Sequence, residues 1–150
     1  MDGKLKNLSI IASSGCHRYD YWHEQYLFDG RSDTGWCTPS RSAAQEEYII
    51  ISLERNTVIS KIRMLSREIN ENAGFPVDFD FFMNVGDNMN DWIKILSVRD
   101  FQNKRATWHE WFVEKAISGN MVKLLIYKVG VRPENKYFTQ FMCLELFKNI

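Results

Sequence analysis

Alternation of apolar and polar side chains at every second residue constrains this chain more than any other feature. In DFDFFMNV, residues 78–85, the apolar residues Phe79, Phe81 and Met83 fall on one face, and Asp80 falls on the other. A period of two is typical of a β-strand that buries one face. The segment therefore predicts a strand covered on one side.

Other segments repeat this pattern and are separated by short stretches rich in Gly, Asn, Asp and Pro: 47–53, 58–65, 91–97, 107–113, 121–128 and 140–147. No stretch sustains helical periodicity for three turns, although residues 22–28 are expected to form about one turn. About seven strands without helical alternation favour an antiparallel sandwich. The length of 150 residues fits one domain, so a single domain is expected over residues 1–150.

The charge balance excludes some classes of partner. Nineteen basic and nineteen acidic side chains cancel, so no broad electrostatic footprint for nucleic acid is expected. No apolar run approaches the roughly 18 residues of a membrane span. The first residues, MDGKLKNLSII, lack the apolar core of a secretory signal. The chain is therefore expected to be either intracellular or a module of a longer secreted protein.

The three cysteines give no metal or redox motif. Cys16, Cys37 and Cys143 form no C-x-x-C pair and have no Cys/His spacing typical of zinc. We expect three free thiols, with Cys143 in the core.

Catalytic patterns are weak, so no enzymatic activity is expected. No G-x-S-x-G is present, and Cys37 is near His17 and His23 only in sequence. His109 lies within an expected strand and is assigned a structural role. The carboxylate pairs are expected on solvated strand faces: Glu46 with Glu47, and Asp78 with Asp80.

The segment FDGRSDTGW, residues 28–36, leaves two interpretations open. Asp29, Asp33 and Thr34 offer the oxygen atoms that calcium prefers, but alone they are too few. The alternative is an Asx turn that bends at Asp29-Gly30. Glu145 is the only charge in the largely apolar QFMCLELF and is expected at a strand end, in an ion pair with the nearby Lys148, or on a metal.

The order of motifs resembles a known family. Ala12-Ser13-Ser14 is followed by FDGRSDTGW, EYIIISL, VISKIRMLSRE, GFPVDFDFFMNVGDNMNDW and the terminal QFMCLELF. This order resembles the discoidin family, the coagulation factor V/VIII C-terminal-type domains, and within it bacterial carbohydrate-binding modules appended to glycoside hydrolases. The resemblance implies an all-β fold, an eight-stranded antiparallel jelly-roll β-sandwich of the galactose-binding-like type, usually without catalysis.

The resemblance also implies a structural calcium ion near the binding end of the sandwich. Its ligands would be the Phe28 carbonyl, the Asp29 carboxylate, the Arg31 carbonyl, the Thr34 hydroxyl and carbonyl, and Glu145. Asp33 would either contribute or only hold the turn.

A sugar site is implied on the loops at the same end. Arg67 and Asn72 have the spacing of sugar-binding polar residues, and Tyr137 and Phe138 would supply an aromatic platform. Trp22, Tyr21 and His23 are alternative contacts, and Cys37 stands where some members place a histidine. The competing interpretations are that Arg67 pairs with Glu68 or Glu71, and that Phe138 belongs to the core.

Together these features predict a calcium-stabilised, non-catalytic carbohydrate-binding module. The module would belong to a larger extracellular or cell-surface protein, whose other domains would be its partners. One alternative is a discoidin-type module that binds a protein or a phospholipid surface. Another is a structural domain of a larger enzyme that binds nothing itself.

Overall fold

The computed structural model describes residues 3–17, 20, 22–67, 74–86, 88–130 and 137–149. These residues form β-strands and one short 3₁₀ helix, which confirms the all-β prediction. In chain order the elements are β1 (Ser9–Ser13), η1 (Glu24–Phe28), β2 (Trp36–Cys37), β3 (Glu47–Leu65), β4 (Pro76–Asn84), β5 (Trp92–Val98), β6 (Trp108–Phe112), β7 (Ser118–Val129), β8 (Gln140–Phe141) and β9 (Cys143–Lys148).

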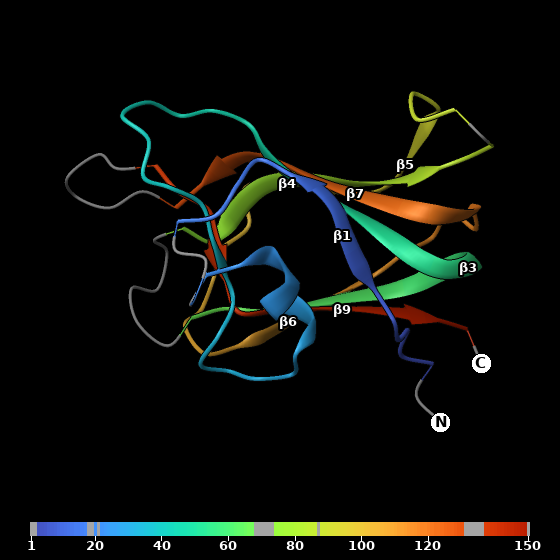
Figure 1. Cartoon of the computed structure of the whole chain (residues 1–150), viewed down its shortest axis with the longest axis horizontal. Coiled ribbons are helices and arrows are strands. Elements are labelled where there is room, and N and C mark those ends of the chain that lie inside the picture. The colour runs from blue at the N-terminus through green and yellow to red at the C-terminus, as the bar shows by residue number, and fades with distance from the viewer. Residues whose placement is uncertain are drawn as a thin grey trace.

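The long strand β3 joins the two layers of the sandwich (Figure 1). Its first part pairs with β1 and β7, in a layer ordered β1-β3-β7-β4-β5. Its last part, from Ile59 to Leu65, pairs with β9 and β6 in the second layer. The register with β7 shifts between Ser52 and Thr57, and the strand passes to the second layer after Val58, its last residue paired with β7. The predicted strands 47–53 and 58–65 are therefore one continuous, bent strand.

The core lies between these layers and follows the predicted alternation. Phe79, Phe81 and Met83 on β4 are fully buried, as are Val122 and Leu124 on the neighbouring strand β7. Aromatic rings of the two layers meet edge to face, which suits their quadrupoles; the rings of Phe79 and Trp111, for example, lie 5.4 Å apart.

Two carboxylates expected on solvated faces are buried, and that prediction was wrong. Asp80 has 0% exposure and Glu47 has 3%. Burial of a carboxylate requires partners, because an unpaired buried charge is costly. Asp80 is held by Arg99 and Tyr127, and Glu47 by Arg41. All these partners come from other segments of the chain, which strand periodicity cannot locate.

The short strands β1 and β2 were not predicted, because neither shows an alternation long enough to detect. β1 pairs along the edge of β3, and β2 pairs with β8 as a two-stranded ladder that closes one end of the sandwich. The expected turn of helix within 22–28 is present as η1. The three cysteines are free thiols, as predicted, and Cys143 is buried. In the described part of the chain, no helix has the length and hydropathy required to cross a membrane.

Candidate functional site

The loop between η1 and β2 is an Asx turn, one of its two predicted interpretations. The Asp29 carboxylate accepts a hydrogen bond from the Arg31 backbone N–H at 2.8 Å through Oδ1, and another from the Thr34 hydroxyl through Oδ2. Gly30 adopts φ +74°, which a residue without Cβ reaches easily. Both oxygens of Asp29 are thus engaged within the loop.

Asp33 faces solvent and pairs with its own neighbour. Its carboxylate accepts bonds of 2.8 and 2.7 Å from the Arg31 guanidinium, and both side chains are more than 60% exposed. The hydrogen bond from Arg31 lowers the pKa of Asp33. This ion pair stabilises the turn on its solvent-exposed side.

Glu145 lies on β9 with its carboxylate held by two cations. Lys4 Nζ approaches Oε2 at 2.7 Å, and Arg63 Nη1 donates to Oε1 at 3.1 Å. Arg63 is the direct cross-strand neighbour of Glu145 in the β3–β9 register. The expected alternative partner, Lys148, was therefore wrong: it lies three residues further along β9, and side chains at that spacing point to opposite faces of a strand.

Cys143 contacts the loop directly, a role that the sequence did not suggest. Its thiol is buried and donates to the Arg31 carbonyl oxygen at 3.1 Å. Burial, with added repulsion from Asp29 and Glu145, raises the pKa of Cys143 to about 12, so the group stays a neutral donor. Gly35 lets the end of the loop approach the backbone just before β9, because a Cβ there would lie 2.5 Å from the Phe141 carbonyl oxygen.

Several of the oxygen atoms implied as calcium ligands have protein partners. The Asp29 carboxylate is bonded to the Arg31 N–H and the Thr34 hydroxyl, the Arg31 carbonyl accepts from Cys143, and Glu145 is paired with Lys4 and Arg63. Within the described ranges, no three His, Cys, Asp or Glu side chains gather as potential metal ligands.

The end of the sandwich closed by β2 and β8 brings together three of the predicted sugar-binding residues. The Cys37 backbone N–H donates to the Trp22 carbonyl at 3.3 Å, and Cys37 pairs with Gln140 across the β2–β8 ladder. Arg67 Nη1 donates to the Gln140 side chain at 3.1 Å, and its guanidinium lies 5.1 Å from the centre of the Trp22 ring. Trp22 itself packs beside the buried cluster of Leu65, Met142 and Cys143.

Arg67 donates one side-chain hydrogen bond to the described residues. Its contacts with described residues are an amide oxygen and an aromatic face, neither of which is charged. The predicted alternative partners Glu68 and Glu71 lie outside the described residues, as do Asn72 and Tyr21. The guanidinium fork can therefore offer paired N–H groups to a ligand.

Tyr137 and Phe138 line a neighbouring cavity of about 470 Å³. Tyr137 is half-buried and exchanges backbone hydrogen bonds of 2.7 and 3.1 Å with Arg41. Phe138 is only 6% exposed, so it supports the cavity wall from the core side, as its competing interpretation proposed. Three lining side chains have polar atoms without a hydrogen-bond partner among the described residues: Arg41 Nε, Glu47 Oε2 and Thr139 Oγ1.

The remaining histidine candidates have structural roles. His23 caps η1, where its Nδ1 accepts from the Gln25 N–H at 3.1 Å. His109 packs against Phe75, Phe101 and Trp111, and its Nε2 lies 2.8 Å from Asn103 Oδ1. Burial lowers the pKa of His109, which favours a neutral ring.

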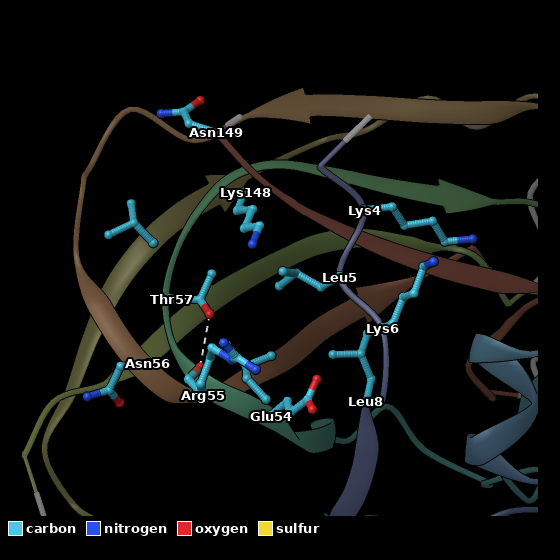
Figure 2. Close-up of a pocket in the computed structure, with 12 residues that line it drawn as sticks. Lys4, Leu5, Lys6, Leu8, Glu54, Arg55, Asn56, Thr57, Lys148 and Asn149 are labelled. Carbon is cyan, nitrogen blue, oxygen red and sulfur yellow. Dashed lines mark hydrogen bonds between the residues drawn. The ribbon is translucent and has the colours of Figure 1, made fainter. Parts of the chain in front are cut away.

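A further cavity of about 540 Å³ lies beside the two chain termini, at the C-terminal end of β9 (Figure 2). Within its lining, the Thr57 hydroxyl donates a hydrogen bond of 2.9 Å to the Arg55 carbonyl (Figure 2). The Lys4 side chain points away from this cavity (Figure 2).

Comparison with known proteins places this geometry in a family. Residues 9–144 match the F5/8 type C domain. Among solved structures, similar ones include a family 32 carbohydrate-binding module from a family 31 glycoside hydrolase of Clostridium perfringens, with a TM-score of 0.80, 17% identity and coverage of 98% of this chain and 96% of the other. The NanJ family 32 module of C. perfringens, solved with galactose, gives a TM-score of 0.77 at 12% identity, with 99% and 100% covered.

A third similar structure also contains a sugar. It is a family 32 module of C. perfringens GH89 in complex with GalNAc-β-1,3-galactose, with a TM-score of 0.72, 16% identity, and 94% and 95% of the two chains covered. No curated protein matches the sequence.

Proposed function

Because the chain belongs to the F5/8 type C domain family, we propose that it is a non-catalytic carbohydrate-binding module that recognises a glycan through the end of the sandwich closed by β2 and β8. The observation that carries this proposal is the placement of Arg67 over Trp22 and beside Gln140. A sugar ring needs paired donors for its hydroxyls and an aromatic face for its C–H surface. This cluster offers both.

Tyr137 extends the proposed surface toward the 470 Å³ cavity. The cavity is of ordinary size for a ligand site, and its wall combines aromatic rings with a few polar groups. Phe138 and Cys37 are both nearly buried, so they support this surface rather than contact the sugar. A single small site of this kind binds weakly, and other domains of a larger extracellular protein would add avidity.

A glycan array, followed by calorimetry on the best ligand, tests the proposal. Galactose- and GalNAc-containing glycans are the first candidates, because similar modules are solved with them. We expect Arg67→Ala to weaken binding at least about tenfold, which corresponds to roughly 1.4 kcal/mol, since the paired donors are lost. Arg67→Lys is expected to be intermediate, because lysine lacks the planar fork.

Arg55→Ala is the matched control, because Arg55 lies in the cavity beside the termini. It should bind the glycan as the wild type does. Tyr137→Ala should weaken binding without removing it. The proposed site would be refuted if no glycan on the array binds, or if Arg67→Ala binds the best glycan as tightly as the wild type does. Binding to phosphatidylserine vesicles in place of glycans would favour the membrane-surface alternative.

A further inference from the structure

The loop of residues 28–35 is connected to β9 by a side chain that cannot serve as an oxygen ligand. The Cys143 thiol reaches the Arg31 carbonyl at 3.1 Å, where it donates a hydrogen. A calcium ion at this carbonyl would have to share the oxygen with that donor and would find a sulfur atom next to it. Hard cations such as calcium prefer oxygen.

A lysine is already placed at Glu145, the carboxylate two residues after Cys143 on β9. The segment before β1 runs beside β9: the Leu5 N–H donates to the Leu146 carbonyl at 2.8 Å, and the Lys148 N–H donates to the Gly3 carbonyl at 2.9 Å. This pairing positions Lys4, whose ammonium group lies 2.7 Å from Glu145. The Glu145 side chain is 14% exposed and that of Lys4 is 39% exposed, so the carboxylate is the more shielded member of the pair.

The positions of these charges also oppose a divalent ion. Lys4 borders a cavity of about 210 Å³ together with Phe28, Gly30, Cys143 and Glu145. Arg63 approaches Glu145 from the other side at 3.1 Å. The single negative charge of Glu145 is therefore shared by two cations, and a third would add repulsion.

We propose that this loop is held without calcium: the Cys143 thiol ties it to β9, and Lys4 occupies the carboxylate that a metal ion would need. The hydrogen bonds that the Asp29 carboxylate accepts from Arg31 and Thr34 close the loop on itself. The loop is thus a metal-independent version of an element for which the family resemblance implies a metal.

Thermal unfolding in excess EDTA and in excess calcium chloride tests whether the loop is held without calcium. We expect the two Tm values to agree within about 1 °C. A calcium ion bound at a hundredfold excess over its Kd would raise the Tm by roughly 5–10 °C for a domain of this size. A shift of that size in the wild-type chain overturns the proposal.

Hydrogen exchange tests the role of the thiol. Cys143→Ala should speed exchange of the backbone amides in the 28–35 loop, because the bond to Arg31 is lost. Cys37→Ala is the matched control, since Cys37 is also buried but its thiol contacts the carbonyl of the adjacent Thr38. Unchanged protection in Cys143→Ala, or equal loosening in both variants, refutes the thiol connection.

A designed gain of calcium binding gives the complementary test. In the double variant Cys143→Glu with Lys4→Met, a carboxylate faces the Arg31 carbonyl and Glu145 is released from the lysine. We expect its Tm to rise with calcium, or the variant to fold only with calcium. If the double variant folds and its Tm does not change with calcium, the role given to Cys143 is contradicted. If the double variant does not fold at all, the wild-type Tm values and the hydrogen exchange of Cys143→Ala test the proposal.

Discussion

Replacement of Asp80 by asparagine should lower the free energy of unfolding by about 2–3 kcal/mol at pH 7. Asp80 is fully buried between β5 and β7, and its carboxylate accepts from Arg99 at 2.9 and 3.2 Å and from the Tyr127 hydroxyl at 2.8 Å. Lys94 adds an ion pair at 3.3 Å. An amide keeps the shape of the side chain but loses these charge-assisted bonds.

The pKa of Asp80 gives this prediction a pH dependence. Burial alone would raise that pKa, but hydrogen bonds from Arg99, Ser97, Tyr127 and Lys94 outweigh it and lower the pKa to about 2 from an ordinary 3.8. A lowered pKa in the folded state means that the stabilisation is complete above pH 3.8 and is lost as the pH falls toward 2. The difference between wild type and variant should shrink over that window.

Urea unfolding at pH 7, and at several values below 4, measures both effects. Asp78→Asn is the matched control two residues earlier on the same strand. Asp78 is half-buried and accepts one bond, from the Asp100 N–H at 2.8 Å, so its loss should cost no more than about 1 kcal/mol. Equal costs for the two variants, or a constant Asp80→Asn cost down to pH 2, would contradict the role given to Asp80.

Trp36→Ala should cost about 3–5 kcal/mol, the range for a large aromatic side chain removed from a core. Trp36 has 0% exposure, and its ring meets Phe141 edge to face at 5.9 Å. Its indole N–H donates to the Gly15 carbonyl at 2.8 Å. The substitution therefore leaves both a void and an unpaired carbonyl, and it releases the first loop from β2.

Denaturant unfolding checks this prediction, with Trp92→Ala as the control. Trp92 is half-buried on β5, where Lys123 lies 4.9 Å from its ring centre, so its removal should cost much less. Trp36→Phe should fall between, because it retains a ring but loses the bond to Gly15. A Trp36→Ala cost no larger than that of Trp92→Ala would show that this tryptophan does not anchor the loop end.

The strands of the fold could be predicted where a long alternation exists. Phe79, Phe81 and Met83 on β4, and Val122 and Leu124 on β7, lie in the core as the period of two requires. The bend of β3 could not be predicted, because its exposed residues between 54 and 56 resemble an ordinary turn between two strands. Pairing with β7 on both sides of these residues, at Ser52 and at Thr57, keeps the chain extended there.

The candidate site was predictable only in part. Arg67, Trp22 and Cys37 were selected from their loops, and the structure brings them to one end of the sandwich. Gln140, which links Arg67 to this end, was not selected, since a glutamine at the start of a strand carries no specific signal. Tyr137 and Phe138 lie one residue apart, yet one is half-buried and the other nearly inaccessible.

By itself, the sequence determined the β class and the core faces of the principal strands, because these depend on periodicity. It left the loop at Asp29-Gly30 open between an Asx turn and a metal site. Only the tertiary structure decided which side chains meet. It placed Cys143 rather than Glu145 against the Arg31 carbonyl, and Lys4 rather than Lys148 on Glu145. Such choices depend on register and on contacts between segments more than 100 residues apart, such as Arg31 with Cys143, and no local pattern encodes them.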